Sequence, residues 1–155
     1  MLSSAGAALG LNGGTVRNLA GVNGSTVRVA GGAPTISTAD TNGYGGSITG
    51  GGGVTADGTG TLTLTGRVSM PAAHWRLDQG TLVLGPGATM SVGSLTQQPA
   101  ETLSIDPGSV ITSAGAIRLS GRLALSALAA VPFVLLAAAA AVVLARRRQA
   151  AGPAA

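Results

Sequence analysis

A ten-residue block that occurs three times is the feature that most constrains how this chain can fold. The copies occupy residues 61–70, 81–90 and 102–111, so their starts lie 20 and 21 residues apart. In each copy the second and fourth residues are Leu or Ile, and a glycine-containing turn follows them. Apolar residues at every second position indicate a half-buried strand, and the turn indicates a corner after it. The pairs Pro86-Gly87 and Pro107-Gly108 suit a sharp corner, because proline fixes φ and glycine readily takes a positive φ.

Shorter segments around these blocks fit the same scheme. Residues 73–77, 91–96 and 116–119 are predicted as further strands, and Thr-Val-Arg occurs at residues 15–17 and again at 26–28. One coil of such a repeat cannot bury its apolar row alone, so stacked coils must form the core. We therefore predict an all-β fold, a parallel β-helix (β-solenoid) with coils of about 20 residues. In it, Leu62, Leu82 and Leu103 form an internal row. An antiparallel sandwich of hairpins is the alternative, since it also alternates and turns at glycines.

The expected boundaries of this domain follow from where the pattern begins and ends. The β-solenoid is predicted over residues 14–122, after a disordered or truncated start at residues 1–13. Residues 42–53 are saturated with glycine, and we expect a disordered loop or a loose coil there, with a strand only at residues 47–49. The outward positions Thr63, Thr65 and Ser104 are expected to form flat polar ladders.

Three stretches of this region resemble a known family. GTLTLTG, QGTLVLGPGATMSVGSLTQ and AETLSIDPGSVITSAGAIRLSGRLALS look like the right-handed β-helix repeats of bacterial autotransporter passengers and related surface adhesins. The resemblance covers about residues 45–125 and implies a β-helix displayed on a bacterial surface. The chain departs from that family because an apolar segment and an arginine cluster, rather than an outer-membrane barrel, follow the repeats. This tail resembles the anchors of surface proteins from single-membrane, high-GC bacteria, although no LPxTG-like sorting motif precedes it.

Residues 123–145 form that apolar segment and contain no charged side chain. A helix of this length reaches about 35 Å, enough to cross a hydrocarbon core of about 30 Å. A chain this short could hardly wrap such a segment as a buried core helix, so we predict one transmembrane helix, bent at Pro132. The residues expected to hold it in the membrane are Leu123, Val131, Phe133, Leu135, Leu136, Val143 and Leu144.

Three consecutive arginines indicate the orientation of this helix. Arg146, Arg147 and Arg148 follow it directly, and by the positive-inside rule residues 146–155 are a cytoplasmic basic tail. The predicted location is therefore the bacterial cell membrane, with a single span and the N-terminal domain outside the cell. Residues 1–16 lack a charged and apolar leader pattern, so we expect the chain to be the C-terminal part of a longer exported protein.

The composition excludes several classes of function. The chain has no Cys, which rules out a disulfide scaffold, a cysteine zinc site and a thiol nucleophile. Residues 1–122 carry six scattered Arg against five acidic residues, and only 2% of the chain is aromatic. A nucleic-acid partner would require a basic face with aromatic side chains for stacking, and none is predicted. We also predict no cofactor and no metal.

The few residues that could support catalysis are better explained structurally. His74 and Trp75 could form a catalytic or sugar-stacking pair, but we expect Trp75 to fill a coil corner and His74 to point to solvent. Asp57, Asp78 and Glu101 lie at different offsets before their Thr-Leu blocks, so they are not expected to form one site. Residues 51–56 match G-x-G-x-x-A, yet a strand rather than a helix is predicted after them. No catalytic residue is therefore assigned, and the protein is not expected to be an enzyme.

These features together predict a membrane-anchored bacterial surface protein with a structural or adhesive β-helix ectodomain. Its expected partners are the membrane and surface glycans or proteins. The alternatives are the C-terminal part of a polysaccharide-active β-helix enzyme whose site lies upstream, and a partial or decayed reading frame.

Overall fold

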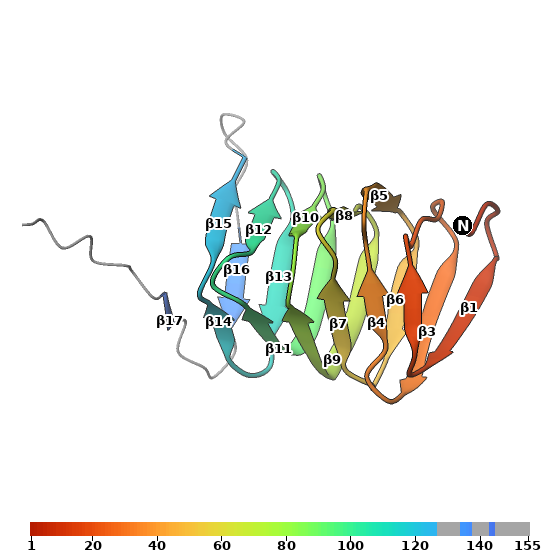
Figure 1. The fold of residues 1–155 in the computed structure, drawn as a ribbon, viewed down its shortest axis with the longest axis horizontal. Helices are drawn as coiled ribbons and strands as arrows, with labels where there is room; N and C mark the ends of the chain where they lie inside the picture. Colours follow the sequence, from red (N-terminus) through yellow and green to blue (C-terminus); the bar gives the residue numbers. More distant parts are fainter. Residues whose placement is uncertain (127–133, 138–142, 145–155) are drawn as a thin grey trace, which may run out of the picture.

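The strands of the protein stack into a solenoid in which every strand pair is parallel. We describe residues 1–126, 134–137 and 143–144 of the computed structural model. The chain passes repeatedly through three faces, and Figure 1 shows the strands side by side along the long axis, from β1 at the red end to β15 near the blue end. The parallel pairing confirms the predicted β-solenoid and excludes the antiparallel sandwich.

Each of the three faces is one column of hydrogen-bonded strands. Face A comprises β5 (Thr41–Tyr44), β8 (Thr61–Leu64), β10 (Thr81–Leu84), β12 (Thr102–Ile105) and β15 (Arg122–Leu125). Face B comprises β1 (Ala8–Asn12), β3 (Thr26–Gly31), β6 (Ser47–Gly50), the first halves of β9 (Arg67–Leu77) and β11 (Thr89–Gln97), β13 (Val110–Ser113) and β16 (Val134–Ala137). Face C comprises β2 (Thr15–Arg17), β4 (Thr35–Ser37), β7 (Val54–Asp57), the second halves of β9 and β11, β14 (Ile117–Leu119) and β17 (Val143–Leu144).

The core consists of apolar rows that run from coil to coil. Leu62, Leu82 and Leu103 are paired in register, and none is more than 3% exposed, which confirms the predicted internal row. Similar buried rows lie on face B (Val27, Ile48, Val68, Met90 and Ile111) and on face C (Val54, Trp75, Leu95 and Ile117). Each row places apolar side chains directly over one another, which removes them from water along the whole stack.

The ten-residue blocks align without a gap only up to the corner. Leu64 pairs with Leu84, but beyond the corner Val68 pairs with Met90, and Met70 pairs with Val92. The reason is corner length: two residues separate β8 from β9, whereas four separate β10 from β11. Residues 70 and 90 end the first two ten-residue blocks but are therefore not equivalent in the fold, because the longer corner adds the two residues of the Pro-Gly turn.

The glycine-rich residues 42–53 form part of a complete coil. They contribute to β5 and β6 and lead into β7, so of the two expectations the coil is found and the disordered loop is wrong. The strands also extend beyond residues 47–49, where alone a strand was expected. Glycine is required at this corner because neighbouring coils touch: a Cβ on Gly66 would lie 2.0 Å from the carbonyl oxygen of Gly46. The glycines of this coil stack closely on their neighbours, and Tyr44 and Ile48 supply its buried side chains.

The solenoid extends further at both ends than the sequence predicted. It begins at β1 rather than at residue 14, because Ala8 to Leu11 pair in register with β3. Leu123, expected at the start of a helix, lies in β15 and pairs with Leu103. The backbone of β16 pairs with β13, and that of β17 with β14, so Leu135, Leu136, Val143 and Leu144 lie in strands. Among the described residues no helix has the length and apolar character needed to cross a membrane. Val131, Phe133, Arg146, Arg147 and Arg148 lie outside the described residues.

Candidate functional site

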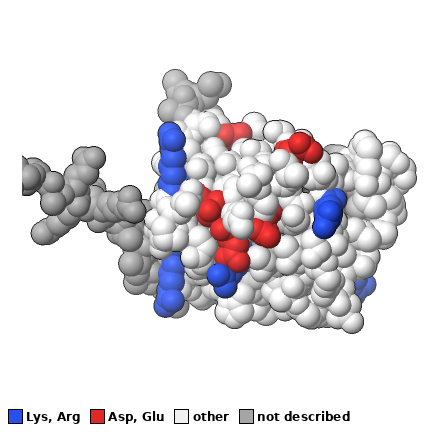
Figure 2. All heavy atoms as spheres, in the orientation of Figure 1, with Lys and Arg blue, Asp and Glu red and all other residues white. Residues whose placement is uncertain are grey.

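The acidic and basic side chains are distributed unevenly over the surface. Figure 2 shows acidic side chains gathered around the middle of one side of the molecule. Four of the five acidic residues lie at the corner between faces C and A, next to the ends of the adjoining strands: Asp40, Asp57, Asp78 and Glu101. The fifth, Asp106, lies at the corner between faces A and B and accepts a hydrogen bond from the hydroxyl of Ser126 at 2.7 Å.

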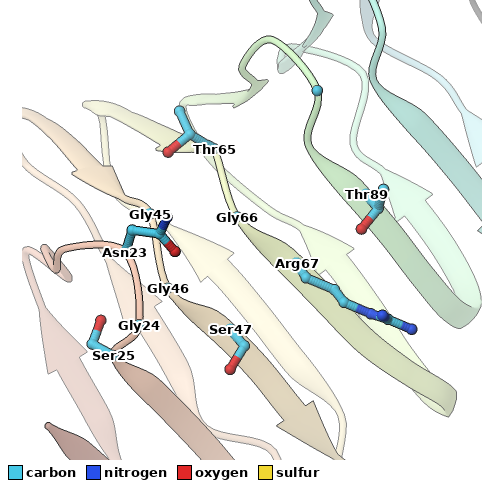
Figure 3. Close-up of a pocket in the computed structure, with 11 residues that line it drawn as sticks. Asn23, Gly24, Ser25, Gly45, Gly46, Ser47, Thr65, Gly66, Arg67 and Thr89 are labelled. Carbon is cyan, nitrogen blue, oxygen red and sulfur yellow. The ribbon is translucent and has the colours of Figure 1, made fainter. Parts of the chain in front are cut away.

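A hollow of about 340 Å³ lies at the corner between faces A and B, and we call it the corner groove. Its lining comes from successive coils and consists of small, polar and glycine residues with one arginine, as Figure 3 shows. The lining residues are Asn23, Gly24, Ser25, Gly45, Gly46, Ser47, Thr65, Gly66, Arg67, Gly87 and Thr89. None of them is acidic, so the electrostatic character of the groove is set by Arg67.

The corner groove exists because successive corners differ in length. The corner at Gly45 and Gly46 and the next one, at Thr65 and Gly66, have two residues each. These short corners protrude less than the longer corners that follow. The following corner has four residues and includes the exposed Gly87, which lies at the far end of the groove. The Ser109 hydroxyl fixes the longer corners, since it lies 3.0 Å from the carbonyl oxygen of Gly85 and 2.7 Å from that of Asp106.

A second hollow of about 340 Å³ continues from the corner groove onto face B. It shares Arg67 and Thr89 with the corner groove and extends to Val110 and Thr112. Arg67 is paired with Ser47 on one side and with Thr89 on the other, and Ser47 is paired in turn with Thr26. The hydroxyl oxygens of Thr26 and Ser47 are 3.2 Å apart, so these paired residues form a ladder of hydroxyl groups interrupted by one guanidinium.

Arg67 is exposed and has no salt bridge to any other described residue. The one ion pair among those residues joins Arg76 to Asp78 at the corner between faces C and A. An unpaired guanidinium beside hydroxyl groups offers donors in a planar fork, which matches the geometry of a carboxylate or a sulfate.

His74 lies in a separate hollow of about 370 Å³ on face C. Its Nδ1 atom is 2.5 Å from the Ser94 hydroxyl on the neighbouring strand, and Arg118 lines the same hollow. Ser94 is the one hydrogen-bond partner of this imidazole among the described side chains, so no carboxylate orients the ring as a catalytic base requires. His74 is exposed, as predicted, but Trp75 lies within the face C strand rather than at a coil corner. Trp75 is 1% exposed, so it fills the core and cannot act as a sugar platform.

The carboxylates are closer together than the sequence suggested. Asp57 and Asp78 directly follow Ala56 and Leu77, which pair with each other, so the two aspartates lie at the same corner in adjacent coils. Asp78 is committed to its ion pair with Arg76. No group of three His, Asp or Glu side chains within the described ranges could hold a metal ion.

The nucleotide-binding pattern at residues 51–56 has no structural support. These residues lead directly into strand β7, Val54–Asp57, and no helix N-terminus is present there to hold a pyrophosphate. Comparison with protein-family models, with curated proteins and with solved structures gave no match for this chain.

The corner groove was not predicted from the sequence, although the Pro-Gly pairs that lengthen the later corners were recognised. The outward positions Thr63, Thr65 and Ser104 are exposed or half-buried, as predicted. They do not form the expected polar ladder, because Val83 pairs between Thr63 and Ser104 and Thr65 lies at the corner after β8. The hollow depends instead on a two-residue difference in corner length, which a gapless alignment of the blocks hides. Fold and site together define a parallel β-solenoid with a groove that begins at the corner between faces A and B and continues onto face B.

Proposed function

We propose that the protein is a bacterial surface protein whose β-solenoid contacts other molecules without chemical turnover, and that its apolar C-terminal segment anchors it in the membrane. The observation that carries this proposal is the arrangement of the surface: hydroxyl ladders and an open polar groove run along a rigid stack of coils. Such a surface offers many weak contacts in a row, which suits adhesion and presentation.

The anchoring part of the proposal rests on residues 123–145 and on the three arginines after them. In a bilayer, residues from about 127 onward would form a helix, because lipid cannot satisfy the hydrogen bonds of an open strand edge. Helix formation would replace the pairing of β16 with β13 and of β17 with β14. The arginines would remain in the cytoplasm, and the solenoid would remain outside the cell.

Fractionation of cells that produce the protein tests the anchor. The full chain is expected in the membrane fraction, with the solenoid cleaved by protease added outside intact cells. Deleting residues 127–148 should release the solenoid, whereas replacing Gln149 by Ala, a control in the tail, should change nothing. A deleted chain that stays with the membrane, or a solenoid protected in intact cells, would contradict the proposal. Adhesion without release of product from a bound glycan separates a contact function from an enzyme.

A further inference from the structure

The geometry points to the corner groove as the binding site of an acidic polysaccharide that lies along the solenoid axis, with Arg67 pairing with one sugar carboxylate. This inference rests on the proposed contact function and names its ligand class.

The extent of the groove fits a chain-like ligand. The corner groove and its continuation on face B together run from the corner at Asn23 to Thr112. They cross five neighbouring strands, β3, β6, β9, β11 and β13. At about 4.8 Å between neighbouring strands, the path is roughly 19 Å long. A small anion would occupy only a fraction of this length, whereas several consecutive sugar rings would fill it.

The charge and hydrogen-bonding groups of the groove fit an acidic ligand rather than a cationic one. Arg67 lies near the middle of the path, and neither hollow is lined by an acidic residue. Ser47 and Thr89 flank the arginine on the adjacent strands, as Figure 3 shows. The guanidinium can pair with a carboxylate through two hydrogen bonds, while the hydroxyl groups pair with sugar hydroxyls.

A peptide or a nucleic acid fits the groove less well. An extended peptide usually gains its affinity from the free edge of a sheet, but this groove runs across strands that are already paired on both sides. A nucleic acid requires several cations and aromatic side chains for stacking, and the two hollows supply one arginine and no aromatic residue. A sugar chain with an acid on alternate rings requires few charges and many hydroxyl partners.

The test is a binding titration with the full 155-residue chain in mild detergent, using a hyaluronan hexasaccharide as the probe. The probe should bind and its affinity should fall with added salt, whereas the neutral sugar maltohexaose should not bind. Arg67→Gln should weaken binding by about tenfold or more, the loss expected for a charge-assisted hydrogen bond. The matched control is Arg28→Gln, because Arg28 is also exposed on face B but lines neither hollow.

A second pair of variants tests the path rather than the charge. Thr65→Trp should block the groove and abolish binding, whereas Thr63→Trp, two residues earlier on face A and outside the groove, should leave binding unchanged. Circular dichroism spectra equal to those of the parent chain would show that the variants fold. Unchanged affinity in both Arg67→Gln and Thr65→Trp would overturn the inference, as would equal binding of maltohexaose or tighter binding of polyglutamate. These failures would leave the fractionation result, and therefore the anchored location, intact.

Discussion

Tyr44 shows how one side chain can start an internal row. It pairs in register with Leu64, which is followed in the next coils by Leu84 and Ile105, so an aromatic ring begins an aliphatic stack. The ring is 1% exposed, and its hydroxyl donates a hydrogen bond to the carbonyl oxygen of Ser47 at 3.2 Å. Burial raises the pKa of the Tyr44 phenol, because the charged form would lose its hydration.

This shift predicts a loss of stability in alkali. Below the ordinary tyrosine pKa of about 10 the contribution of Tyr44 is fully present, and it is lost as the pH rises through the raised pKa of the folded state. Tyr44→Phe should remove this pH dependence and cost about 1 kcal/mol near neutral pH through the lost hydrogen bond. Because Tyr44 is the sole tyrosine, phenolate absorbance reports its titration directly. An ordinary tyrosine titration in the folded protein would contradict the prediction.

At the scale of elements, strands were easier to predict than corners. The alternation of Leu62 and Leu64 is repeated in the next two coils, so burial and register follow from the apolar pattern alone. The coil through β5 and β6 could not be predicted in this way, because glycines carry no side-chain pattern and that coil is positioned by contact with its neighbours. The corner groove was missed for the related reason that it depends on how corners of unequal length stack.

Glycines that touch a neighbouring coil should therefore tolerate substitution far less than glycines with open space around them. Gly66→Ala places a Cβ against the carbonyl oxygen of Gly46, and we expect it to lower the free energy of unfolding by about 1–3 kcal/mol or more. Gly43→Ala is the matched control, because Gly43 lies in β5 with open space around the added Cβ. Urea unfolding of both variants checks this expectation. Equal losses would show that the contact at Gly66 relaxes without cost.

At the scale of the molecule, the solenoid is close to one-dimensional, since each coil contacts only the coils next to it. A central coil such as that of β10 is covered on both sides, by β8 and by β12. The first coil is covered on one side among the described residues, where β1 pairs with β3. In such stacks stability is close to a sum of coil and interface contributions, so position along the axis should determine the cost of a defect.

Two leucine truncations test that expectation. Leu82→Ala should destabilise the protein by about 2–5 kcal/mol, because Leu82 is fully buried between two coils. Leu11→Ala, in the first coil, should cost less, and amide hydrogen exchange should be faster in β1 than in β10. The contradicting result would be equal costs together with uniform exchange along the axis.

The unequal corners also make the fold a practical scaffold. The corner after β10 is two residues longer than the corner after β8 in the preceding coil. Leu82 nevertheless keeps its pairing with both neighbouring leucines, Leu62 and Leu103. The turn at Pro86 and Gly87 is exposed, and closing a longer loop costs little additional entropy. A peptide tag or a dye-labelling sequence inserted between these two residues would be displayed at the rim of the groove without disturbing the strands on either side.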